Sequence, residues 1–258
     1  YSLVKNLNEH ILDNPEFSNL PRKFNITLSG CPDDCVHAET QDLALVPAIE
    51  EKGGNTVYGF NVLVGGKLGS GGYRIATPLD VFLCPDEVVE VCSALILLYR
   101  DHGNRDVRSK NRLAFLIEGW GEEKFRSALE GRVGRLLTRA GVDLRGNEKS
   151  EHIGAYRQKQ KSMNYVGLKI PVGRIQSDKL KGLARLSEKY GNEEIRFSHS
   201  NSLVIPNVPD KKLGDMLEEA LVKEFSYNPS SVLRGLVSCV GSDYCNLAAI
   251  ETKSMALK

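Results

Sequence analysis

The stretch NYVGLKIPVGRIQSDKLKGLARLSEKYGNEEIRFSHSNSLVIPNVPDKKLGDMLEEALVKE, residues 164–224, decides the fold of this 258-residue chain. Its apolar and β-branched positions predict a strand, a helix, two strands and a helix, at 164–170, 178–190, 194–199, 202–206 and 209–224. Ser177 is a suitable N-cap for the first helix, and Gly191 follows its end. This β-α-β-β-α order is half of a ferredoxin-like arrangement, and an open half-sheet usually needs a partner to cover its edge.

Strands and helices are also predicted upstream of this stretch. FNITLS at 24–29 and VYGFNVLV at 57–64 have the composition of strands. A helix follows Pro85, because apolar residues then recur at helical spacing until Gly103. Two further helices and a polar linker are predicted at 109–118, 121–138 and 140–161. The fold class is therefore α+β with mixed sheets.

The composition limits the classes of function. The 34 basic and 33 acidic residues nearly balance, which argues against nucleic acid as a partner. No apolar run is long enough for a membrane span. Six cysteines are too sparse for a disulfide scaffold, so we expect a reducing compartment, the cytoplasm or a plastid stroma. The chain begins without Met and stops inside a predicted helix, and we therefore expect it to be an internal fragment of a longer protein.

Four cysteines form two closely spaced pairs. Cys239 and Cys245 stand five residues apart beside a glycine, a gap wider than zinc sites favour and one that suits a loop around a bulkier group. Cys31 and Cys35 form a second pair, and together the pairs give the four thiols that a four-iron cluster requires. A disulfide or two core thiols is the alternative for Cys239 and Cys245, and ordinary turn and core residues are the alternative for Cys31 and Cys35. The cysteines at 84 and 92 fit packing.

Several basic side chains could bind anions. Strand alternation places Lys23 and Asn25 on one face, where an ammonium and an amide could hold a small anion and deliver protons to it. The alternative is a solvated strand start. Arg196 on a strand and Arg174 in a glycine-containing turn could clamp carboxylates, or could be ordinary surface arginines.

The chain closely resembles the sirohaem and four-iron–four-sulfur nitrite and sulfite reductase family, and within it the ferredoxin-dependent nitrite reductases. The resemblance lies in LPRKFN at 20–25, DLALVPA at 42–48, GFNVLVGG at 59–66, RDHG at 100–103, GLKIPVGRIQSD at 167–178, LVIPN at 203–207 and CVGSDYCNLAAIETK at 239–253. It implies a domain layout in four parts. These are a partial first sirohaem/Fe-S-type α/β repeat, a linker, a ferredoxin-like half domain and the truncated start of a second repeat, at 1–150, 151–163, 164–228 and 232–258.

The resemblance also implies ligands for the cofactors. Cys239 and Cys245 match the first pair of cluster ligands, and the second pair is expected beyond Lys258. Cys31 and Cys35 occupy the pseudo-symmetric position in the first repeat, as a relic of duplication. Basic residues near the carboxylates of the macrocycle are matched by Arg22 and Arg196, and Asn201 falls where the family usually has Gln.

The activity implied is the assimilatory reduction of nitrite to ammonia, with six electrons delivered from ferredoxin through a [4Fe-4S] cluster to sirohaem. Lys23 and Asn25 match the two side chains at the anion-binding face. Sulfite reductases tend to carry Lys in place of this Asn, which favours nitrite. We expect the full-length enzyme to be monomeric. The alternatives are a sulfite reductase, a non-catalytic fragment that holds no cofactor alone, and a zinc-binding module.

Overall fold

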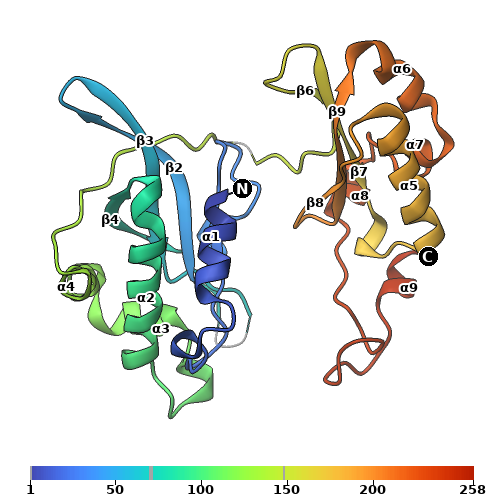
Figure 1. Ribbon diagram of the computed structural model, residues 1–258. Coiled ribbons are helices and arrows are strands. Elements are labelled where there is room, and N and C mark those ends of the chain that lie inside the picture. The colour runs from blue at the N-terminus through green and yellow to red at the C-terminus, as the bar shows by residue number, and fades with distance from the viewer. Residues whose placement is uncertain (1, 70–71, 148) are drawn as a thin grey trace. The chain divides into compact units, whose positions relative to one another are not determined.

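The computed structural model describes residues 2–69, 72–147 and 149–258, and the chain divides into two compact units. The first unit covers residues 1–149 and the second covers 150–258 (Figure 1). Among the described residues, no helix combines the length and the apolar character needed to cross a membrane.

A five-stranded sheet forms the centre of the first unit. Its strands are β1 (Ile26–Leu28), β2 (Leu43–Lys52), β3 (Asn55–Val64), β4 (Thr77–Leu83) and β5 (Val142–Asp143). They run in the order β1-β2-β3-β4, with β5 paired to β2, and only the β1–β2 pair is parallel. The β2–β3 hairpin turns at Gly53 and Gly54, whose φ angles of 59° and 81° suit glycine at both central positions.

Helices cover one face of this sheet (Figure 1). They are α1 (Ser2–Ile11), α2 (Val88–His102), α3 (Leu113–Trp120) and α4 (Glu122–Val133). Short 3-10 turns lie at η1 (Pro15–Phe17), η2 (Ala38–Thr40), η3 (Pro85–Glu87) and η4 (Arg108–Lys110). Leu43 and Leu45 point into the helical core, whereas the intervening Ala44 packs with Ala38 and Ala76 on the other face. The strand β2 is therefore buried on both sides at its start.

The second unit is a four-stranded antiparallel sheet with helices on one face (Figure 1). Its strands are β6 (Gly154–Arg157), β7 (Met163–Lys169), β8 (Arg196–Phe197) and β9 (Ser202–Pro209), in the order β6-β7-β9-β8. Its helices are α5 (Ser177–Tyr190), α6 (Asp210–Glu218), α7 (Ala220–Phe225), α8 (Ser231–Gly235) and α9 (Lys253–Ala256), and a 3-10 turn, η5, spans Pro171–Gly173. Alternate residues of β7 and β9, such as Val166 and Ile205, pack against Leu183 of α5.

The β-α-β-β-α order predicted for 164–224 is confirmed as β7-α5-β8-β9-α6, and the helix predicted after Pro85 is α2. Three local predictions are wrong. The helix expected over 209–224 is interrupted at Glu219, whose ψ of 137° is extended. The helix expected from about Asn246 begins only at Lys253, and the N-cap of α5 is Gln176, with Ser177 as its first helical residue.

The sequence also predicts a linker where the structure has a strand. Four residues inside the span 151–163 form β6, which pairs antiparallel with β7. The sequence pattern did not predict this strand, because a short edge strand buries little apolar surface, and its residues Tyr156 and Arg157 are exposed. The strands β2 and β4 were not predicted as separate elements.

Candidate functional site

The C-terminal cysteine loop, residues 236–252, carries Cys239 and Cys245 on a tight turn. The backbone amides of Tyr244 and Cys245 both donate to the carbonyl oxygen of Gly241, at 3.3 and 3.0 Å. The amide of Ser242 donates to the carbonyl of Ile250 at 3.0 Å, which closes the loop. Cys239 is exposed and Cys245 is half-buried. The two thiols are thus presented by one closed loop.

Gly241 is required by this geometry. Its φ is 67°, in the left-handed region, and the residue is buried. A Cβ atom at this position would lie 2.8 Å from both the backbone nitrogen and the Oγ1 of Thr252. Only glycine therefore lets the turn approach the segment that precedes α9.

The thiol of Cys239 lies beside polar groups of its own loop. Its Sγ lies 3.5 Å from the Oγ1 of Thr252, whose hydroxyl also donates to the carbonyl oxygen of Cys239 at 2.8 Å. The Thr252 hydroxyl and, next, the backbone N–H of Gly241 lower the pKa of the Cys239 thiol. The thiolate is the form that ligates metals and clusters. A four-iron cluster takes four thiolates, so the donor set of this loop fits one half of such a site.

Two basic residues hold the C-terminal cysteine loop against the rest of the second unit. The Nη2 of Arg174 lies 2.6 Å from Asp243 and 3.7 Å from Glu251, and its Nη1 donates to Ser254 at 3.3 Å. Lys253 is only 9% exposed, and its ammonium donates to the carbonyl oxygen of Val172. Arg174, considered from sequence as a carboxylate clamp, binds carboxylates of this loop.

Lys23 and Asn25 lie just before β1. A buried ion pair fixes this segment: Asp42 is fully buried, and Arg112 binds it through two hydrogen bonds of 2.9 and 2.7 Å. The same carboxylate accepts the backbone N–H of Asn25 at 3.0 Å. Within the described part of the chain, no hydrogen bond or ion pair engages the side chain of Lys23, which is exposed, or that of Asn25.

The other three predicted site residues differ in their surroundings. Arg22 is half-buried, and its backbone is hydrogen-bonded to the Tyr99 hydroxyl. The side chain of Arg196 is 63% exposed and lies 2.5 Å from Glu194. The carbonyl of Asn201 accepts the N–H of Ile170 at 2.9 Å. Across the described residues, no hydrogen bond joins Arg196 to Asn201.

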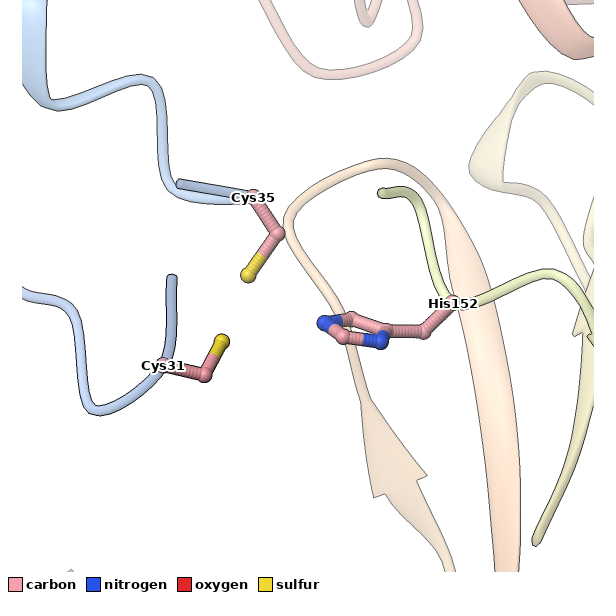
Figure 2. Close-up of side chains that lie close together, drawn as sticks. All are labelled: Cys31, Cys35 and His152. Carbon is pink, nitrogen blue, oxygen red and sulfur yellow. The ribbon is translucent and has the colours of Figure 1, made fainter. Parts of the chain in front are cut away.

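The N-terminal cysteine loop, residues 29–37, carries the other pair. Figure 2 shows the thiols of Cys31 and Cys35 directed toward one another, and their Sγ atoms lie within 4.8 Å. A hydrogen bond with Cys31, followed by burial, raises the pKa of Cys35. His152, also drawn in Figure 2, belongs to the second unit, where its Nδ1 lies 3.3 Å from the hydroxyl of Tyr165.

Sequence reasoning missed the residues that position these loops. Asp42 and Arg112 are 70 positions apart, so no local pattern could pair them. Thr252 stands 13 positions from the thiol whose pKa it lowers. Among these residues, only Gly241 could have been predicted from the sequence, because a glycine between two paired cysteines is typical of a tight turn with a positive φ.

Two family models match the chain. The first, described as the nitrite and sulphite reductase 4Fe-4S domain, matches residues 1–137. The second, the nitrite/sulfite reductase ferredoxin-like half domain, matches residues 156–222.

Relatives and a solved structure are similar over almost the whole chain. The ferredoxin–nitrite reductase of Synechococcus elongatus is 42% identical over 95% of this chain and 47% of its own length. The chloroplastic enzyme of that name from Oryza sativa is also 42% identical, over 95% and 41%. The structure of the Mycobacterium tuberculosis NirA protein gives a TM-score of 0.90 at 31% identity, covering 99% of this chain and 46% of that one. The chain thus spans less than half the length of these proteins.

Proposed function

Because the chain belongs to the nitrite and sulphite reductase family, we propose that the full-length protein reduces nitrite to ammonia with six electrons from ferredoxin. The proposed cofactors are a [4Fe-4S] cluster and sirohaem, which would supply the electron transfer and the iron that takes the anion. The names of the relatives support nitrite as the substrate and ferredoxin as the donor.

The C-terminal cysteine loop carries this proposal. Cys239 and Cys245 would hold one edge of the cluster, and the lowered pKa of Cys239 supports that role. The loop also exposes apolar side chains that a free surface rarely gathers in one segment. They are Val237, Val240, Tyr244, Leu247 and Ile250. Such a surface suits a loop that is covered by a cofactor or by another part of the full-length protein.

The basic residues would act on the substrate and the macrocycle. The exposed ammonium of Lys23 would hold the negative charge that develops on the anion and donate protons to its oxygen. The Asn25 amide would orient the anion by a hydrogen bond. Arg22 and Arg196 would bind carboxylates of the macrocycle, and Asn201 would also contribute to cofactor binding.

We also propose a domain layout for the chain. Residues 1–150 would be the partial first repeat, 164–228 the ferredoxin-like half domain and 232–258 the start of a second repeat, with 151–163 between the first two. The family matches at 1–137 and 156–222 support the first two assignments.

Lys23→Ala in the full-length protein tests the function. We expect turnover of nitrite to fall about a hundredfold, because a positioned proton donor typically contributes at least that factor. The absorption of the cluster and sirohaem should stay unchanged. Lys52→Ala, at an exposed lysine at the end of β2, is the matched control. Undiminished nitrite turnover in Lys23→Ala would count against the assignment.

The same preparation tests the substrate and the cofactors. Comparison of kcat/KM for nitrite and sulfite decides between the two anions, and we expect Asn25→Lys to move the preference toward sulfite. A colourless protein that retains zinc would instead support the zinc-binding module.

A further inference from the structure

The pair Cys31 and Cys35 is not used by the proposed function. Both thiols are half-buried, and their Sγ atoms lie within 4.8 Å of one another. In Figure 2 the sulfur atoms of the two side chains face one another. A disulfide has an S–S length of about 2.05 Å, so its formation would bring the two sulfur atoms closer than they lie in the reduced chain.

The backbone of the N-terminal cysteine loop is braced at several points. The Oγ of Ser29 donates to the carbonyl of Cys31 at 2.8 Å, and Gly146 donates to the carbonyl of Pro32 at 2.9 Å. The buried Asp34 accepts the backbone N–H of Ala38 at 3.1 Å. These bonds brace the backbone at Cys31 and at the residues between and beside the two cysteines. The folded chain therefore keeps the two sulfurs together.

We propose that Cys31 and Cys35 form a thiol–disulfide exchange site whose co-substrate is a low-molecular-weight disulfide of the glutathione type. One protein thiolate attacks the small disulfide, forming a mixed disulfide and releasing one small thiol. The second protein thiolate then attacks the protein sulfur of that bond and releases the other. Two protein thiols lose two protons and two electrons, and the small disulfide is reduced to two thiols. Excess small thiol reverses the sequence.

The other cysteines of the chain provide internal comparisons. Cys92 is 1% exposed within α2, so a small disulfide has little access to its sulfur, whereas Cys31 and Cys35 are only half-buried. Cys84 precedes that helix. Trypsin separates the three cysteine pairs of this chain, because each lies on a different peptide. These are residues 24–52, 75–100 and 235–253.

The test is glutathione redox titration of the full-length protein, followed by acid quench, alkylation and tryptic mass mapping. We expect peptide 24–52 to acquire an internal disulfide at an oxidised-to-reduced glutathione ratio at least about tenfold lower when folded than in denaturant, because folding removes the cost of closing the loop. Peptide 75–100 should remain reduced in the folded protein. Equal ratios in the folded and unfolded protein would overturn the proposal. Glutathione adducts on both cysteines of peptide 24–52, or bound zinc that blocks exchange, would also overturn it.

Two variants and a second reagent test the pairing of the thiols in a way that does not depend on one variant folding correctly. Cys35→Ser should trap a glutathione adduct on Cys31, because the resolving thiol is missing. In the unchanged protein, one equivalent of phenylarsine oxide, which bridges neighbouring thiols, should protect both cysteines of peptide 24–52 from alkylation. It should not protect the remaining thiol in Cys35→Ser or in Cys31→Ser. Full alkylation of peptide 24–52 after the arsenical would refute the pairing.

Discussion

The two cysteine loops of this chain treat their thiols in opposite ways. In the N-terminal loop, the thiols are hydrogen-bonded to each other, and this raises the pKa of Cys35. In the C-terminal loop, the Thr252 hydroxyl and a backbone N–H act on Cys239 and lower its pKa. The two thiols thus differ in the groups that hydrogen-bond their sulfur atoms, and this difference moves their pKa values in opposite directions.

The loops also differ in how an arginine–aspartate pair secures them. At the end of the segment that follows the N-terminal loop, Asp42 is fully buried and the side chain of Arg112 is only 11% exposed. In the C-terminal loop, the side chains of Arg174 and Asp243 are 32% and 43% exposed. Breaking the Asp42–Arg112 pair would leave a buried charge without a partner, whereas the partly exposed Arg174–Asp243 pair can open at little cost in free energy.

The largest expected effect is a difference in cluster content between variants of the two loops. In the full-length protein, Cys239→Ser should lower bound iron and the visible cluster absorption at least about tenfold, because a four-iron cluster loses one of its thiolates. Cys31→Ser, the matched change in the other loop, should leave both within experimental error. Equal loss in the two variants would break the comparison.

The second effect concerns stability. Arg112→Ala should lower the free energy of unfolding of the first unit by about 3–5 kcal/mol, because it strands the buried Asp42 charge. Arg174→Ala should change stability by about 0–1 kcal/mol, since its ion pairs are partly exposed. Urea unfolding of the 258-residue chain can follow its single tryptophan, Trp120, which packs against Phe125 in the first unit.

The control for this prediction removes the stranded charge. The double variant with Asp42→Asn and Arg112→Ala should recover part of the lost stability, because no buried carboxylate then lacks a partner. If the double variant is as unstable as Arg112→Ala, packing of the arginine rather than charge explains the loss.

The smallest effect is a pH dependence. Alkylation requires the thiolate, so the pH midpoint for Cys239 in the cluster-free protein should lie below that of an ordinary cysteine, and that of Cys35 above it. Thr252→Val removes the hydroxyl that is the largest cause of the lowered pKa, and it should raise the Cys239 midpoint. Iodoacetamide labelling across pH, with Cys92 as the buried reference, measures both shifts. If Thr252→Val leaves the Cys239 midpoint unchanged, the low pKa would come from the backbone N–H of Gly241 instead.

Local patterns predicted the fold well where one face of an element is buried. The helix α2 and the strands β7 and β9 have strong periodicity, and the order of the second unit follows from them. The break at Glu219 was missed because a single extended residue leaves the helical pattern on both sides intact. The sequence pattern predicts a helix at 246–252, although the bonds from the N–H of Ser242 to the carbonyl of Ile250 and from the N–H of Ala248 to that of Cys245 hold this segment in another conformation.

The chemistry of the candidate site was predictable only in part. The paired cysteines and the alternation of Lys23 and Asn25 are visible in the sequence. Their electrostatic environment is not, because Thr252 and Gly241 act on Cys239 through a turn that only the folded chain creates. Contacts of this kind join distant positions and leave no periodic signal.

The attachment of the C-terminal cysteine loop bears on how such a protein matures. Lys253 is buried against the carbonyl of Val172, and Arg174 grips the loop between its cysteines. Val172 and Arg174 belong to the segment that joins β7 to α5, so the C-terminal cysteine loop takes its shape when that domain folds. If Cys239 and Cys245 hold a cluster as proposed, folding of this domain would set these two thiols in position before the cluster arrives.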